Sequence, residues 1–188
     1  MDATKLGDAA AFEQIVRRHQ GSLINYFYKF TGNFEQSREL TQDVFLRVFQ
    51  SANRYKPVAK FTTYLFTIAH NLAINEVIAK KRNEEEFTDD RIPNGYFPFS
   101  DKTPEDAILV KEIQTEVRHA LFRLTSRERS AIIMKYTEGM TYDEIAGATG
   151  SSESAVESLI MRARAKLKLS LKKTAEKSAF SHKKINTK

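Results

Sequence analysis

Mostly polar side chains recur on one face of a predicted helix near the end of the chain. They are Ser154, Glu157, Ser158, Met161 and Arg162, followed by Ala165. Hydroxyl, carboxylate and guanidinium groups are the side chains that hydrogen-bond to base edges and phosphates. The opposite face carries Val156, Leu159, Ile160, Ala163 and Leu167 at helical spacing, which predicts a buried stripe. The polar face is therefore a candidate surface for reading duplex DNA.

A second short helix precedes this one and sets its position. Thr141 and Glu144 form a possible capping box, Gly150 is a natural helix stop, and Ser151 or Ser152 can cap the next helix. Helix, glycine-containing turn and helix is the layout of a helix-turn-helix. An ordinary antiparallel helix pair with a solvated polar face is the alternative.

Basic residues crowd the segment from 155 to 188. The bases are Arg162, Arg164, Lys166, Lys168, Lys172, Lys173, Lys177, Lys183, Lys184 and Lys188, and the acids are only Glu157 and Glu176. Such an excess beside a candidate reading helix suits phosphate contact with release of counterions. It favours the DNA-reading interpretation.

A different polar mixture lies in the first half of the chain. Tyr64, His70, Asn71 and Asn75, with Lys56 and Lys60 before them, combine an aromatic ring, amides and cations. Unstacked bases present rings and edges, so single-stranded nucleic acid suits this mixture. An ordinary solvated helix face is the alternative, and His70 is also considered as a partly buried helix residue.

Composition excludes several other classes. The 188 residues carry a net charge of +6 with a pI near 9.4, and 41% are hydrophobic. No cysteine is present, and the four histidines have no metal-ligand spacing. No phosphate-binding loop, dinucleotide fingerprint or nucleophile elbow appears, so we expect no enzyme, cofactor or metal. Neither a signal peptide nor a membrane span is evident, and we expect a cytoplasmic protein without membrane insertion.

Apolar periodicity predicts an all-α fold of two small helical domains. We expect helices over about 9–30, 34–55 and 62–81, then 108–124, a helix that a Thr125–Glu128 capping box opens and that ends near Gly139, and the helix-turn-helix. Phe49, Ile113 and Val117 belong to the predicted buried stripes. Residues 1–82 form the first domain and 107–172 the second, with a basic, frayed tail over 173–188.

An acidic segment separates the two domains. Residues 83–106 contain eight acids against two bases, with four prolines or glycines and no helical period. This composition predicts a flexible linker. Its aromatic residues Tyr96, Phe97 and Phe99 either dock on a surface or pack loosely against the chain itself.

Two blocks of sequence resemble one known family. LTQDVFLRVFQ (40–50) followed by FTTYLFTIAHNLAINEVIAKKR (61–82) resembles region 2 of bacterial sigma factors. The block ALFRLTSRERSAIIMKYTEGMTYDEIAGATGSSESAVESLIMRARAKL (120–167) resembles region 4. With only an acidic linker between them, the layout resembles the extracytoplasmic-function (ECF) group. The resemblance covers about residues 9–171.

The resemblance implies a promoter-specificity subunit of RNA polymerase, used in stress or envelope responses. Region 2 would dock on the clamp helices of the largest core subunit through Glu39, Leu40, Gln42, Asp43, Leu46 and Arg47. It would bind the minus-10 element, with a flipped base near Asn71, through Lys60, Phe61, Thr62, Tyr64, His70, Asn71 and Asn75. Region 4 would read the minus-35 element through Ser154, Glu157, Ser158, Met161 and Arg162, with Arg164 and Lys166 toward phosphate. The implied partners are core polymerase, including its flap, duplex and single-stranded promoter DNA, and an anti-sigma factor.

The sequence departs from the family pattern in three places. Tyr64 stands where tryptophan is common, so an aromatic ring remains. Arg38 stands where an acid is usual, which can alter the clamp contact. Glu157 and Leu159 replace expected cations. Glu157 either accepts from a cytosine amino group or weakens phosphate contact, which leaves the minus-35 sequence open.

Two other classes compete with the sigma-factor interpretation. A stand-alone regulator with the same helix-turn-helix predicts DNA binding without polymerase, usually at a palindromic site. A helical adaptor that binds only proteins predicts a basic tail that serves solubility. Transcription with and without core polymerase separates the three.

Overall fold

The computed structural model describes residues 9–82 and 104–185, and every regular element in them is helical. The helices are α2 (Ala9–Thr31), α3 (Phe34–Gln50), the 3₁₀ turn η1 (Ala52–Arg54), α4 (Phe61–Arg82), α5 (Pro104–Phe122), α6 (Ser126–Thr137), α7 (Tyr142–Thr149) and α8 (Glu153–Ile185). This confirms the predicted all-α class. The acidic segment 83–103 and its aromatic residues lie outside the described residues.

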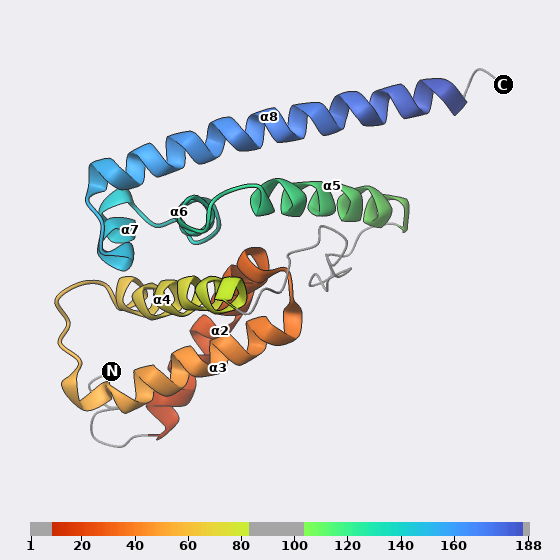
Figure 1. Ribbon diagram of the computed structural model, residues 1–188. Coiled ribbons are helices and arrows are strands. Elements are labelled where there is room, and N and C mark those ends of the chain that lie inside the picture. Colours follow the sequence, from red (N-terminus) through yellow and green to blue (C-terminus); the bar gives the residue numbers. More distant parts are fainter. Residues whose placement is uncertain (1–8, 83–103, 186–188) are drawn as a thin grey trace.

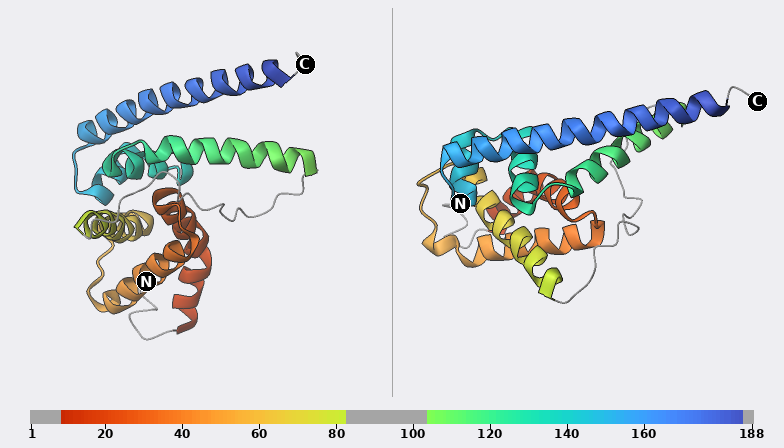
Figure 2. Two further views of the ribbon diagram at one scale, coloured as in Figure 1. Left: turned by 45° about the vertical axis from the view of Figure 1, so that its right-hand side comes forward. Right: turned by 45° about the horizontal axis from the view of Figure 1, so that its top comes forward.

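The helices form two groups that pack on each other. Figures 1 and 2 show α2, α3 and α4 as one group, with α5, α6 and α7 beside them and α8 along the outer side. Helix α4 packs against α7, and α2 packs against α5 and α6. One apolar cluster runs through both groups, from Leu23, Tyr26 and Phe27 to Val156 and Ile160. The two predicted domains therefore share a continuous core.

Local sequence signals set several helix ends. Gly32 adopts a left-handed φ of 73°, which suits glycine, and Asn33 then caps α3 through the Gln36 backbone N–H at 3.1 Å. A Cβ at Gly32 would lie 2.9 Å from Cζ of Phe122 in α5. Gly32 therefore permits both a turn and the close approach of the two groups.

Three predicted boundaries differ from those observed. Helix α3 ends at Gln50 and gives way to η1, and α5 begins at Pro104, inside the segment assigned to the linker. Helix α8 continues to Ile185, so the prediction of a frayed tail is wrong. From Glu153 to Ile185 the sequence contains no glycine or proline and is rich in lysine, alanine and leucine, which favour helix. In Figure 1 the C-terminal end of this helix extends beyond α5.

Candidate polymerase and nucleic-acid interfaces

The helix-turn-helix forms as the sequence predicts. Thr141 accepts from the Glu144 backbone N–H at 3.2 Å, and Glu144 accepts from the Thr141 backbone N–H at 2.9 Å. Gly150 closes α7 in the left-handed conformation at φ 62°. The Ser152 hydroxyl accepts from the Ala155 backbone N–H at 3.3 Å and caps α8. These short-range bonds fix the turn between the two helices.

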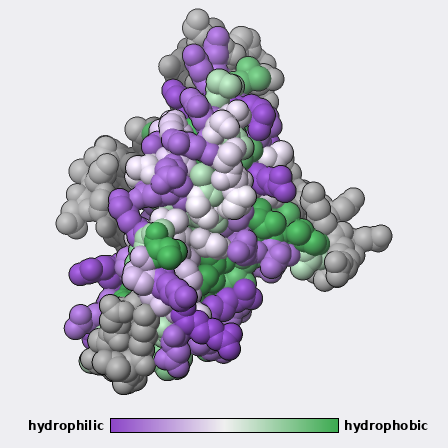
Figure 3. All heavy atoms as spheres, turned by 90° about the vertical axis from the view of Figure 1, so that its left-hand side faces the viewer, coloured by the Kyte–Doolittle hydropathy of each residue, from purple (hydrophilic) through white to green (hydrophobic). Residues whose placement is uncertain are grey.

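The seven candidate minus-35 residues do not all lie on one side of α8. Ser154 and Glu157 are exposed and Ser158 is half-buried. Met161 and Arg164 line an apolar groove on one side, whereas Arg162 and Lys166 approach Glu128 on the other. Figure 3 views the end of the molecule at which α7, the start of α8 and the start of α4 lie, and hydrophilic side chains cover much of that face.

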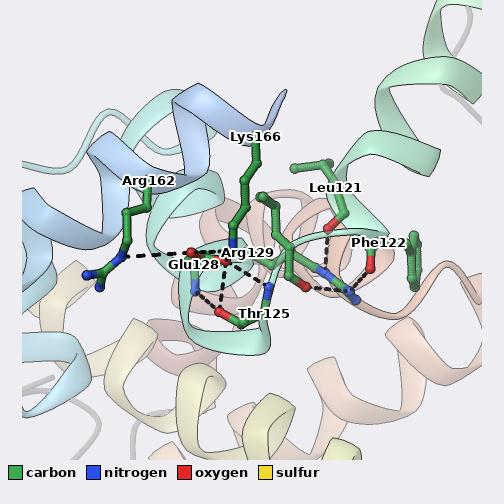
Figure 4. Close-up of polar contacts among 8 residues, drawn as sticks. Leu121, Phe122, Thr125, Glu128, Arg129, Arg162 and Lys166 are labelled. Atoms are coloured by element: carbon green, nitrogen blue, oxygen red, sulfur yellow. Dashed lines mark hydrogen bonds and ion pairs between the residues drawn. The ribbon is translucent and has the colours of Figure 1, made fainter. Parts of the chain in front are cut away.

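Glu128 forms a buried ionic cluster with α8. Both carboxylate oxygens accept from Lys166 Nζ at 2.8 Å, and Oε1 lies 3.9 Å from Arg162 Nε (Figure 4). The carboxylate also accepts from the Thr125 backbone N–H at 3.0 Å in a capping box. Burial raises the pKa of Glu128, but the bonds from Lys166 and Thr125 outweigh it, so this pKa lies below its usual value. Sequence reasoning recognised the capping box and missed the contact with α8.

Aromatic side chains cluster at the start of α4, beside the candidate minus-10 residues. The ring of Tyr64 lies 4.9 Å from that of Tyr55 and 6.2 Å from that of Phe61. The Tyr64 hydroxyl lies 2.5 Å from Ser51 Oγ. Tyr64 is thus half-buried within an aromatic cluster, and Tyr55 is a member that sequence reasoning missed. Proximity to the proline-containing loop was the only sequence signal for it.

The other minus-10 candidates separate into two sets. Asn71 and Asn75 are exposed on α4, and Thr62 is half-buried. Lys60 forms an ion pair with Glu144 of α7 at 2.6 Å. The sequence is compatible with His70 as an outward residue and as a partly buried helix residue, and the side chain is only 8% exposed. Burial is the correct interpretation, because α6 covers this part of α4.

Helix α6 meets His70 through a shared hydroxyl. Nδ1 of His70 lies 2.8 Å from Ser130 Oγ, which also lies 2.8 Å from the Tyr26 hydroxyl. Burial, and secondarily the charge of Arg127, lowers the pKa of His70 to about 4. The imidazole is therefore neutral near pH 7, and a polar network joins α2, α4 and α6.

The candidate polymerase face of α3 is exposed except at one residue. Glu39, Gln42, Asp43, Leu46 and Arg47 are exposed, and Leu46 is 54% exposed. Leu40 is 6% exposed and belongs to the core. Phe49, predicted to be buried, is also exposed, with its ring 5.1 Å from that of Phe12. Exposed apolar side chains beside charged ones, as Leu46 and Phe49 are here, are an expected feature of a protein-binding surface.

An apolar groove of about 630 Å³ lies between α5, α6 and α8. Its lining includes Val117, Leu121, Ile132, Ile133, Tyr136 and Met161, with Lys29, Arg164 and Lys168. Ile113 and Val117, predicted to point inward, are exposed on α5. The prediction was wrong for both residues, and Val117 lines this open groove instead of the core. Within residues 9–82 and 104–185, no helix is long and apolar enough to cross a membrane.

Comparison with known proteins finds two family models that match successive parts of the chain. Residues 15–83 match the model of Sigma-70 region 2, and residues 114–167 match that of Sigma-70, region 4. The ECF RNA polymerase sigma factor SigE of Mycolicibacterium smegmatis is 31% identical over 185 residues, which span 96% of this chain and 69% of that protein. The ECF sigma factor SigW of Bacillus subtilis is 25% identical, over 89% of this chain and 92% of that one.

Two solved structures share the fold over most of their length. CnrH in complex with the cytosolic domain of CnrY has a TM-score of 0.67 at 26% identity, covering 91% of this chain and 94% of that one. The sigma factor RpoE of Bartonella quintana, in complex with the anti-sigma factor NepR, has a TM-score of 0.70 at 19% identity, covering 86% of this chain and 97% of that one. The chain belongs to the sigma-70 family of RNA polymerase sigma factors, in its extracytoplasmic-function group.

Proposed function

We propose that this promoter-specificity subunit divides its work among four surfaces, on α3, on α4, on α8 and in the groove between α5, α6 and α8. Sigma factors direct core RNA polymerase to promoters and carry no reaction of their own. The observation that carries the proposal is a capped helix-turn-helix in the same chain as an exposed α3–α4 face with the sequence of region 2. Use of the protein in a stress or envelope response belongs to the same proposal.

Helix α8 reads the upstream element in the major groove. Its exposed Ser154 and Glu157, with half-buried Ser158, supply hydroxyl and carboxylate groups to base edges. Arg162 lies next to them and supplies a guanidinium. Met161 and Arg164 extend the surface toward the groove, and Lys166 lies on the Glu128 side.

Helix α4 and the loop before it capture the separated strand. Asn71 and Asn75 present amides to an unstacked base, and the cluster of Phe61, Tyr64 and Tyr55 presents rings beside them. Lys60 and His70 bond to α7 and α6 in the structure. Their use in strand capture therefore requires the two helix groups to move apart.

Two apolar surfaces suit the core enzyme. Leu46, surrounded by Glu39, Gln42, Asp43 and Arg47, docks on the clamp helices of the largest subunit. The groove between α5, α6 and α8 receives the flap, because its walls are apolar and its edge is cationic. A protein of the anti-sigma class is a further partner, supported by the RpoE–NepR complex with which this chain shares its fold.

Transcription in vitro tests the function directly. Core RNA polymerase with this chain is expected to give run-off transcripts from a promoter library, and the transcribed fragments should share two sequence elements. Core polymerase alone should give none of them. Duplex binding without core-dependent transcription would instead indicate a stand-alone regulator. The absence of both DNA binding and core-dependent transcription would indicate an adaptor.

Asn71→Ala is expected to reduce promoter opening at least about tenfold, because a lost base contact of about 1.4 kcal/mol has that effect. Binding of the polymerase to the closed duplex should change little. Permanganate reactivity of the separated strand measures opening, and footprinting measures binding. Asn53→Ala, the same change at an exposed asparagine outside the candidate set, is the control. Equal opening by the wild-type and Asn71→Ala proteins contradicts the assignment.

Leu46→Asp is expected to weaken binding to core polymerase by about tenfold or more, because burying a leucine at an interface contributes about 1.5–3 kcal/mol. The fold should persist, since this side chain is 54% exposed. Fluorescence anisotropy of labelled protein titrated with core enzyme measures the affinity. Ile78→Asp, at a similarly exposed residue of α4, is the matched control. Comparable losses in both variants would remove Leu46 from the docking face.

A further inference from the structure

Glu128 holds two cations of the reading helix while it caps α6. Its side chain is 4% exposed, and its carboxylate bonds to the backbone and hydroxyl of Thr125, both at 3.0 Å. The carboxylate belongs to the rigid start of α6, so its position is fixed by the helix end. Any group that it binds on α8 is therefore held in a fixed place relative to α6.

Lys166 is held tightly by this carboxylate. Its ammonium group lies 2.8 Å from both oxygens. A phosphate of DNA would have to displace a buried, backbone-anchored carboxylate to gain the same ammonium. Release of counterions from DNA requires a cation that transfers to phosphate, so Lys166 contributes little to it in this arrangement.

Arg162 is oriented by the same carboxylate. Its Nε lies 3.9 Å from Oε1 of Glu128, and its two terminal nitrogens point away from the cluster in Figure 4. The side chain remains 59% exposed. The fork of terminal nitrogens is the part of arginine that binds a guanine edge or a phosphate. Glu128 thus directs this fork outward.

We propose that Glu128 is a positioning residue for recognition of the upstream promoter element. It aims the fork of Arg162 at the DNA and keeps Lys166 away from phosphate. This inference rests on the proposed function and adds a specificity mechanism to it. Phosphate contacts carry no sequence information, so withholding Lys166 lowers binding to every sequence equally and leaves discrimination between sequences to base contacts such as that of Arg162.

Glu128→Gln tests the proposal with little change of shape. Glutamine also serves in a capping box, so the start of α6 stays capped while the charge is lost. The holoenzyme is titrated with a promoter duplex from the transcribed library and with a duplex whose upstream element is scrambled, at several salt concentrations. The slope of log affinity against log salt is expected to steepen by about one, the value of one added phosphate contact. The ratio of affinities for the two duplexes should fall several-fold, because Arg162 loses the carboxylate that orients its fork toward the bases.

Lys166→Met separates the electrostatic role from a structural one. In the wild-type background it should leave the salt slope unchanged, and in the Glu128→Gln background it should return the slope to the wild-type value. A flatter slope for Lys166→Met alone would show that Lys166 already contacts phosphate, and would overturn the proposal. An unchanged slope and ratio for Glu128→Gln would overturn it equally.

The same set of proteins provides controls for folding and for recognition of the upstream element. Thermal unfolding of each variant shows whether the fold is kept. If Glu128→Gln does not fold, a flatter salt slope for Lys166→Met still overturns the proposal. A wild-type holoenzyme that binds both duplexes equally refutes recognition of the upstream element, and with it this inference. If the wild-type holoenzyme is selective, a flatter slope for Lys166→Met or an unchanged slope and ratio for Glu128→Gln refutes only the role of Glu128.

Discussion

Replacing Arg129 by methionine is expected to lower the free energy of unfolding by about 3–5 kcal/mol, the usual cost of breaking a buried ionic or hydrogen-bonded group. Arg129 is buried and donates to the carbonyl oxygens of Phe30 at 2.7 Å, Leu121 at 3.0 Å, Phe122 at 3.0 Å and Leu124 at 3.3 Å. Its guanidinium also lies 4.2 Å from the ring centre of Phe122. Methionine fills similar space but leaves these acceptors without their donor.

The bonds made by Arg129 satisfy two helix ends at once. The carbonyl of Phe30 belongs to the last turn of α2, and those of Leu121 and Phe122 belong to the last turn of α5. Helix ends expose carbonyls that need donors, and burial removes water as an alternative. Burial lowers the pKa of Arg129 to about 10, so the side chain still carries its charge at neutral pH. One arginine thus joins the region 2 and region 4 helices.

Urea unfolding of Arg129→Met and Arg123→Met measures the effect. Arg123 is exposed and donates to Ser170 Oγ at 3.2 Å, so its replacement should cost less than about 1 kcal/mol. Arg129→Lys should recover only part of the loss, because an ammonium lacks the planar fork that reaches several carbonyls. Equal losses for the two methionine variants would show that the buried bonds contribute little.

Lowering the pH from 7 to 4 is expected to remove about 3 kcal/mol of stability through His70 alone. Burial, with the nearby charge of Arg127, lowers the pKa of His70 from 6.5 to about 4 in the folded chain. The unfolded chain therefore takes up a proton from about pH 6.5 downward, before the folded chain does. The contribution is complete above pH 6.5 and is lost as the pH falls to about 4, and each unit of difference corresponds to about 1.4 kcal/mol.

His70→Asn isolates this contribution. Asparagine does not titrate and can still hydrogen-bond to the Ser130 hydroxyl. Unfolding free energies of both proteins are measured from pH 7 to pH 4. The stability of the wild type relative to His70→Asn should fall by about 3 kcal/mol over this range. Glu128, with a lowered pKa, and Glu138, with a pKa raised by burial, titrate in both proteins and so cancel.

A second histidine variant provides the control for acid unfolding. His19 is half-buried beside Phe61 and does not lie between the helix groups. His19→Asn should keep most of the acid dependence of the wild type. Parallel curves for the wild-type and His70→Asn proteins would show that His70 is protonated without cost in the folded chain.

Local signals in the sequence determined the elements and the family. The capping boxes at Thr125 and Thr141, and the left-handed residue Gly150, depend on neighbours within a few positions, and each forms as expected. The apolar stripe of α8 is likewise set by helical spacing, and Val156, Ile160 and Ala163 are buried. The motifs of regions 2 and 4 follow from contiguous residues, which is why the resemblance and the family comparison agree.

Tertiary structure alone decided which polar residues are available to a partner. His70 is adjacent to exposed Asn71 in the chain, and the packing of α6 on α4 buries it against Ser130. Lys166 shares the charge of Arg164, but only the placement of α6 under α8 brings Glu128 to it. These contacts join residues 38 to 60 positions apart in the chain. Helical spacing specifies the face of one helix, and burial depends on which other helix covers that face.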